Sequence, residues 1–318
     1  MYRLLSAGLA LSLMAGSALA QTAFPTQPIT VVVGFAPGGG MDTMARLVSG
    51  EISPQLGQPV IVENRPGAAG TLAPAFVASA KPDGYTIYAG ETSAILGPVF
   101  QGNVGYDPVK SFTPIARIAV APHALVANPG VGVSTVAQFI DLVSKNPGEY
   151  FYASPGTATL QYLAGEMLKD AAGIEMEAVH FQGGAPSVAA VVSGEVPFGI
   201  VSLSAAAAQA EGGKLVILGH TGPERVKGFE KIPPIAETIK GFEAMPSQFI
   251  MAPAGTPQEI VDRITGAIAR AYEGEKLPGQ LTRAGLIPAF QTGGEVSAEL
   301  PAIAKKLTEV AISVRDGT

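Results

Sequence analysis

The sequence contains no cysteine, and only 14% of its 318 residues are charged. Without cysteine there can be no disulfide framework and no thiolate nucleophile or metal ligand, so stability must come from a hydrophobic core. The three histidines, His123, His180 and His220, lie far apart and form no HxxxH pair, so the sequence predicts no metal site. The motif Gly-x-Ser-x-Gly is also absent. Ser154 lies in YASPG, which lacks the first glycine, so no hydrolase nucleophile elbow is indicated.

Charge and hydropathy exclude further classes of protein. The chain has 20 basic and 26 acidic residues and a net charge of −6, without a basic patch, so we expect neither nucleic acid nor an anionic membrane surface as a partner. Beyond the first twenty residues, no apolar run approaches the roughly 18 residues that a membrane span needs. The hydrophobic content of 47% and the length of the chain predict a sizeable core, divided between two domains.

The first twenty residues have the pattern of a secretory signal peptide. A single basic residue, Arg3, precedes an apolar stretch from Leu4 to about Met14, and Ala18-Leu19-Ala20 is a small-x-small cleavage sequence. The alternative, an uncleaved membrane anchor, is disfavoured because the apolar stretch is too short to span a bilayer. We therefore expect export, with cleavage after Ala20.

Residues 29–46, ITVVVGFAPGGGMDTMAR, predict a strand, a tight glycine loop and the start of a helix. We expect the strand over 29–35 and the helix over 42–55, with Asp42 as its N-cap. Free main-chain N–H groups at a helix start bind anions without needing a charged side chain. This loop is therefore a candidate anion site.

The rest of the chain alternates between strand-like and helix-like segments. This order predicts an α/β fold with two units, each with a mostly parallel sheet flanked by helices. Ligand sites in such sheets lie at the carboxyl ends of the strands, so glycine-rich loops in both units should face one cleft. The further strands are expected at 59–63, 85–89, 124–128, 150–153, 178–181, 249–252 and 289–291, and the further helices at 71–79, 187–193, 258–273 and 295–315, with one more capped by Ser134 and one following the loop 154–157.

Other functions compete with the binding of a small anion. In a dinucleotide-binding enzyme, an acidic residue such as Glu63 would follow the glycine loop by about 20 residues. The glycine spacing fails, however, because Thr43 stands where the third glycine of a motif starting at Gly38 belongs. A secreted hydrolase acting on esters of small or aromatic acids, and a binding module used for sensing, remain as alternatives. The missing catalytic motif argues against the hydrolase.

Several segments occur in an order typical of one known family: FPTQPITVVVGFAPGGGMDTMARLVSGEISPQLGQPVIVENRPGAAGTLA, KPDGYTI, YASPGTATLQYLAGE, FQGGAPSVAAVVSGEV and FIMAPAGTP. Through them the chain resembles the substrate receptors of tripartite tricarboxylate transporters, the Bug-type periplasmic binding proteins. The resemblance implies a two-lobed, type II Venus-flytrap fold, with residues 21–122 and 252–318 in lobe 1 and residues 123–251 in lobe 2.

The same resemblance implies a function without catalysis. Such receptors capture a small carboxylate, whether an organic, dicarboxylic or aromatic acid, in the interdomain cleft of a periplasmic protein. They deliver it to integral-membrane permease subunits. It implies no cofactor and no metal, and we expect a monomer.

The resemblance further implies that main-chain amides hold most of the carboxylate. The ligand-binding residues that we expect come from loops of both lobes. They are Phe35, Ala36, Pro37, Gly38, Gly39, Gly40, Met41, Asp42, Thr92, Ser93, Ser154, Gly156, Thr157, His180, Gly183, Gly184, Ala185 and Ser202.

The chain departs from the family pattern near this expected pocket. Tyr162 stands where a histidine is common, and Met41 replaces a small or hydroxyl residue. The apolar side chains of Met41 and Phe35 could favour a hydrophobic acid. Glu91, just before the Thr92-Ser93 pair, could bind an ammonium group of an amino acid or face solvent, and we expect it to face solvent.

Overall fold

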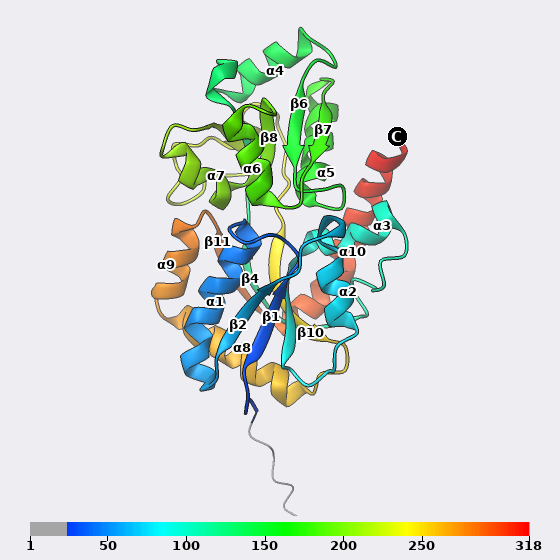
Figure 1. The fold of residues 1–318 in the computed structure, drawn as a ribbon, viewed down its shortest axis with the longest axis vertical. Coiled ribbons are helices and arrows are strands. Elements are labelled where there is room, and N and C mark those ends of the chain that lie inside the picture. Colours follow the sequence, from blue (N-terminus) through cyan, green and yellow to red (C-terminus); the bar gives the residue numbers. More distant parts are fainter. Residues whose placement is uncertain (1–23, 318) are drawn as a thin grey trace, which may run out of the picture.

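The computed structural model describes residues 24–317, so the expected signal peptide and its cleavage site lie outside the described residues. Figure 1 shows two lobes, one above the other, each built around one β-sheet. Within residues 24–317, no helix combines the length and the apolar character that crossing a membrane requires.

The lower lobe contains a mixed sheet in the strand order β11-β4-β10-β3-β1-β2. Strand β1 pairs in parallel with β2 and β3, whereas β10 is antiparallel to β3 and β4, and β11 is antiparallel to β4. The expectation of a mostly parallel sheet is therefore wrong for this lobe, because β10 returns from the other lobe and enters beside β3 in the opposite direction. The strands are β1 (Ile29–Val33), β2 (Val60–Asn64), β3 (Thr86–Glu91), β4 (Phe112–Val120), β10 (Ser247–Pro253) and β11 (Ile287–Thr292).

Helices cover both faces of this sheet, which explains why four of the five residues of β1 are apolar. Val31 and Val33 pack into a core with α1 and α8, and Val32 points to the opposite face and packs with α2 and α10.

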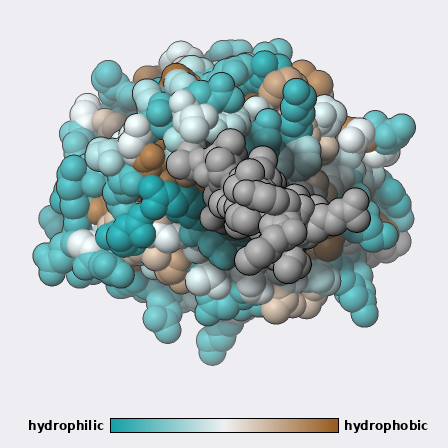
Figure 2. Space-filling view, turned by 90° about the horizontal axis from the view of Figure 1, so that it is seen from below, coloured by the Kyte–Doolittle hydropathy of each residue, from teal (hydrophilic) through white to brown (hydrophobic). Residues whose placement is uncertain are grey.

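Figure 2 views the lower end of the molecule, where hydrophilic residues predominate on the part that grey atoms leave visible. The helices are α1 (Gly40–Leu56), α2 (Leu72–Ala78), α3 (Gly97–Gln101), α8 (Gln258–Glu273), α9 (Lys276–Arg283) and α10 (Gly293–Asp316), with 3-10 turns η1 (Ala68–Gly70) and η2 (Thr92–Ile95).

The upper lobe has a second mixed sheet in the order β7-β6-β8-β5-β9. Strand β6 is parallel to β7 and β8, and β5 is antiparallel to β8 and β9, so this sheet is not mostly parallel either. Its elements are β5 (His123–Ala127), β6 (Phe151–Ser154), β7 (Glu177–His180), β8 (Phe198–Ser202), β9 (Val216–His220), α4 (Val136–Ser144), α5 (Leu160–Ala172), α6 (Gly184–Ser193), α7 (Leu203–Ala210), η3 (Pro129–Val131) and η4 (Ile235–Glu237).

Two expected helix caps differ in the structure. Helix α1 begins at Gly40 with Gly39 as its N-cap, so Asp42 lies inside the first turn and is not the cap. Helix α4 is capped by Thr135, whose hydroxyl accepts from the N–H of Gln138, and not by Ser134. Three strands, β4, β8 and β9, have no counterpart among the expected strands.

The chain passes between the two sheets twice, between β4 and β5 and between β9 and β10. The crossings lie side by side, because the N–H of Ala121 donates to the carbonyl of Pro246 at 2.9 Å. The expected boundary at 251/252 falls inside β10, which belongs to the lower sheet. We propose that the second lobe instead ends before Ser247.

Candidate functional site

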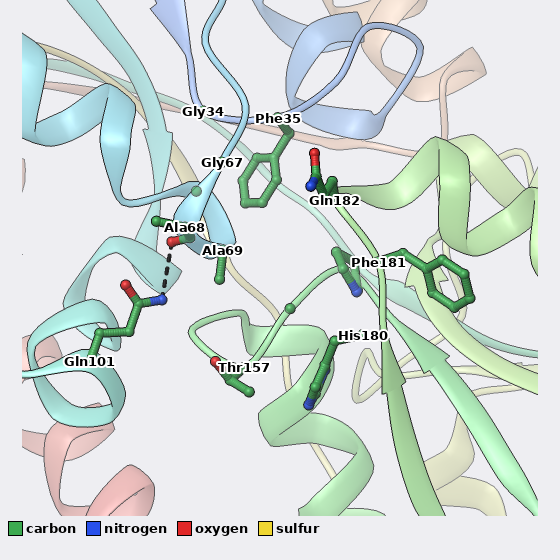
Figure 3. Close-up of a pocket in the computed structure, with 13 residues that line it drawn as sticks. Gly34, Phe35, Gly67, Ala68, Ala69, Gln101, Thr157, His180, Phe181 and Gln182 are labelled. Atoms are coloured by element: carbon green, nitrogen blue, oxygen red, sulfur yellow. Dashed lines mark hydrogen bonds between the residues drawn. The ribbon is translucent and has the colours of Figure 1, made fainter.

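Several cavities between the lobes are lined by residues of both, and two of them share Phe35 and Pro155. The outer cavity, of about 330 Å³, is lined from the lower lobe by Phe35 and residues 67–70 and from the upper lobe by residues 155–157 and 180–182. Figure 3 shows Phe35 pointing into the middle of this group, whereas the ring of Phe181 points away from it toward the upper lobe. Phe35 and Pro155 also line the second, inner cavity.

The inner cavity lies where the ends of both sheets face each other. It has a volume of about 20 Å³, which is room for about one water molecule, so a small acid can enter only if the lobes move apart. Its lining combines main-chain groups of three loops with polar side chains. The residues are Phe35, Gly39, Gly40, Met41, Glu91, Ala121, His123, Pro155, Gln161, Gly184, Ser202 and Gln248.

Two helices from different lobes begin at this cavity. Helix α1 starts at Gly40 and helix α6 at Gly184. Within residues 24–317, no hydrogen bond uses the main-chain N–H groups of Gly39, Gly40 and Met41, or those of Gly184 and Ala185. Unpaired N–H groups at a helix start carry partial positive charge and attract anions. The arrangement therefore offers anion donors from both sides of one space.

The side chain of Asp42 stabilises the glycine loop that precedes α1. Its carboxylate accepts hydrogen bonds from the N–H of Gly38 (3.0 Å), from Nε of Arg46 (3.0 Å) and from Nδ2 of Asn64 (2.9 Å). Burial favours the protonated form, but the hydrogen bonds from Arg46, Gly38 and Asn64 outweigh it and hold the pKa of Asp42 below its usual value. Asp42 is thus a charged part of the scaffold, and it occupies the Gly38 N–H that a ligand would otherwise use.

Glu91 and Gln248 lie next to each other at the floor of the inner cavity. The antiparallel register of β3 and β10 places them opposite each other, on the same face of the lower sheet. Glu91 is only 6% exposed, so the expectation that it faces solvent is wrong. Its Oε1 accepts from Oγ of Ser93 at 2.7 Å, and none of the ion pairs among residues 24–317 includes it. Burial raises the pKa of Glu91 to about 7, although the hydrogen bond from Ser93 lowers it.

His123 and Ser202 form the corresponding pair in the upper sheet, where β5 and β8 are antiparallel. His123 is 1% exposed, and burial lowers its pKa to about 3, so the imidazole is neutral at physiological pH. Both ring nitrogens of His123, Oε1 of Gln161 and Oε1 of Gln248 are buried without a hydrogen-bond partner in the described part of the chain. Each such group costs about 1–3 kcal/mol, which favours a polar ligand that partners them.

Comparison with known proteins agrees with this geometry. The sequence model of the family described as the tripartite tricarboxylate transporter family receptor matches residues 44–297 of this chain. The chain belongs to this receptor family.

Relatives and solved structures cover most of the chain. A UPF0065 protein of Bordetella bronchiseptica is 36% identical over 260 residues, which is 81% of this chain and 77% of that protein. The structure of Rpa4515 of R. palustris with adipate has a TM-score of 0.88 and 30% identity, covering 92% of this chain and 98% of that one. The structure of MatC of Rhodopseudomonas palustris with bound malate has a TM-score of 0.83 and 28% identity, covering 91% of this chain and 100% of that one.

These similarities confirm the expected family and the two-lobed binding-protein fold. Family and fold are those of solute-binding proteins and not of enzymes. Within residues 24–317, no group of three or more potential ligands is arranged to hold a metal ion. Ser154, the serine considered for a hydrolase, is fully buried, and its hydroxyl lies 3.4 Å from the main chain of Gly156.

The structure distributes the expected ligand-binding residues over several places. The inner cavity brings together six of them, from both lobes: Phe35, Gly39, Gly40, Met41, Gly184 and Ser202. The outer cavity contains Gly156, Thr157 and His180, again with Phe35. Gly38 and Ala185 line a third cavity between the lobes, of about 280 Å³. The inner and outer cavities lack Ala36, Pro37, Asp42, Thr92, Ser93, Ser154 and Gly183 in their linings.

Four polar residues of the inner cavity were absent from the expected set: Glu91, His123, Gln161 and Gln248. Glu91 ends β3 at its carboxyl end, and this position is the signal that could have identified it. His123 and Gln248 flank the crossings between the lobes, which only the fold reveals.

The two lobes touch at glycines on either side of the cleft. A Cβ added to Gly40 would lie 2.9 Å from Oγ of Ser204 and 3.0 Å from Cβ of Ser202. A Cβ added to Gly156 would lie 2.8 Å from Cβ of Ala69. Real Cβ atoms rarely approach so closely, so a side chain at either position would have to displace its neighbour in the opposite lobe.

We expect Gly40→Ala to weaken acid binding by about tenfold, because the added methyl group obstructs closure against Ser202 and Ser204. The free energy of unfolding should not fall, since alanine is favoured over glycine in a helix. Calorimetric titration with an acid selected by thermal shift measures the affinity. Gly50→Ala is the matched control, because Gly50 lies in the same helix with no atom near an added Cβ. Equal affinities in both variants would contradict the steric argument.

The raised pKa of Glu91 predicts a pH-dependent stability. The folded protein holds this proton up to about pH 7, whereas the unfolded chain releases it near pH 4.5. The folded state therefore binds more protons in between, and its free energy of unfolding should fall as the pH rises through this window, by about 3 kcal/mol.

Glu91→Gln should remove that contribution, because the amide keeps the shape but does not titrate in this range. Urea unfolding of the ligand-free wild type and variant at pH 5 and pH 8.5 isolates it as a difference between the two proteins. A difference that does not change with pH would show that Glu91 titrates normally.

Proposed function

We propose that this receptor captures a small carboxylate in the inner cavity and delivers it to a membrane permease. The observation that carries the proposal is the meeting of two helix starts from different lobes at one cavity, with the N–H groups of Gly40, Met41 and Gly184 unpaired. Their donors are directional and need no cationic side chain, which suits a carboxylate that must be released again.

A carboxylate held in this way would couple binding to closure of the lobes. A ligand that contacts α1 in the lower lobe and α6 in the upper lobe stabilises the closed arrangement selectively. The paired crossings at Ala121 and Pro246 offer a hinge for that movement. The small volume of the cavity also requires opening before an acid can enter.

The relatives support the ligand class. Structures similar to this chain over nine-tenths of its length hold adipate and malate, and both are small dicarboxylates. The family is described as the receptor of a tripartite transporter, and delivery to permease subunits is the role that we propose for such a receptor. We extend both to this chain as parts of the proposal.

Replacing Gly184 by proline tests the main-chain donors directly. Proline fits the first position of a helix but has no N–H, so Gly184→Pro should weaken carboxylate binding by about tenfold or more, as expected for loss of a hydrogen bond to a charged group. The affinity is measured by calorimetric titration with an acid selected by thermal shift.

Gly184→Ala is the control, because it retains the N–H and its added Cβ would come no closer than 4.0 Å, to Oγ of Ser202. The donor role of Gly184 would be refuted if the proline and alanine variants bound the acid equally well. If no small carboxylate binds the wild type, the proposed function is wrong as a whole.

We also propose that the protein works in the periplasm after removal of residues 1–20. Expression of the full chain in a Gram-negative host should yield a periplasmic protein whose first residue is Gln21, because the small residues Ala18 and Ala20 fit the specificity of signal peptidase. Mass spectrometry of the periplasmic fraction identifies the new terminus. Retention of residues 1–20 on a membrane-bound product would contradict the proposal.

A further inference from the structure

The lining of the inner cavity also contains polar side chains whose hydrogen-bonding character is opposite to that of the helix starts. Three buried side chains present oxygen acceptors to it, Glu91 and Gln248 from the lower lobe and Gln161 from the upper lobe. Oε1 of Gln161 and Oε1 of Gln248 have no partner among the described residues, and both side chains are more than nine-tenths buried. The cavity thus offers N–H donors from α1 and α6, and acceptors from these three residues.

Glu91 determines which group of a ligand is stabilised beside it. A positive group next to Glu91 favours its ionised form, which only accepts hydrogen bonds, whereas a glutamine amide can rotate to offer either its oxygen or its N–H groups. Glu91 has one partner, the hydroxyl of Ser93, and no cation beside it in residues 24–317. Burying a carboxylate without a counter-charge is costly, so a ligand that brings a positive group would be stabilised there.

A second carboxylate on the ligand would be destabilised beside Glu91. It would approach Glu91 as a like charge, and the two would repel each other unless one took up a proton. His123, the other titratable residue of the lining, is neutral and adds no positive charge. An ammonium group has three N–H donors and finds three oxygen-bearing side chains, those of Glu91, Gln161 and Gln248.

We propose that the inner cavity selects a small amino acid, with its carboxylate at the starts of α1 and α6 and its ammonium group at Glu91. Glu91 is then the residue that determines specificity. This inference rests on the proposed carboxylate site and adds the class of substrate to it.

Matched pairs of ligands that differ only in the amino group test the inference. Wild-type protein, unfolded and refolded to remove any ligand acquired during expression, is titrated calorimetrically with alanine and propionate, aspartate and succinate, and glutamate and glutarate. We expect at least one amino acid to bind at least about tenfold more tightly than the acid without the amino group.

The variant Glu91→Gln should abolish that preference. It keeps the shape and the acceptor for Ser93 but removes the charge, so the affinity for the amino acid should fall at least about tenfold, while binding of the paired acid stays equal or improves. Glu63→Gln is the matched control, because Glu63 also lies in a strand of the lower sheet but pairs with Arg65 outside the cavity. It should bind as the wild type does.

Gln161→Met provides a second test from the other lobe in case Glu91→Gln does not fold. It removes the amide at similar size and should weaken amino-acid binding more than binding of the paired acid. If the acids without an amino group bind as tightly as their partners, and both variants leave the preference unchanged, the amino-acid inference is overturned while the carboxylate site stands. If none of the six ligands binds while another small carboxylate does, the inference fails and the proposed function stands. If no small carboxylate binds the wild type, both fail.

Discussion

A buried polar group without a hydrogen-bond partner costs free energy, and this protein gathers such groups around one small cavity between its lobes. Of the eight buried side-chain atoms without a partner in residues 24–317, four belong to His123, Gln161 and Gln248, which line that cavity together with the unpaired main-chain N–H groups of Gly40 and Gly184. A polar ligand that enters and partners them would recover that cost. The polar lining comes from both lobes, so the way the lobes face each other determines what the cavity can bind.

The same lining couples the two lobes. Each lobe contributes part of it, so a ligand that contacts both parts stabilises the arrangement in which they face each other. The lobes approach so closely at Gly40 that even a methyl group would collide with Ser202 and Ser204. The contact between the lobes is therefore tight at the helix start that presents its donors, and two adjacent chain crossings join the lobes.

The sequence predicted the features that depend on neighbouring residues. Glycine loops at the starts of helices were identified because main-chain donors need only a strand, a turn and a helix in succession, as in residues 29–46. The pairing of Glu91 with Gln248 was not predictable, because it depends on the register of β3 against a strand that returns from the other lobe. The same re-entry makes the lower sheet mixed, although the local alternation of strands and helices suggested parallel pairing.

The most direct measurement is a crystal structure of the protein with a small acid bound. The account predicts that the carboxylate lies between the two helix starts, within hydrogen-bond distance of main-chain N–H groups of Gly40 or Met41 and of Gly184. It also predicts that the rest of the ligand extends toward Glu91. An acid bound in the outer cavity beside Ala69 and Thr157, or held by a cationic side chain, would contradict it.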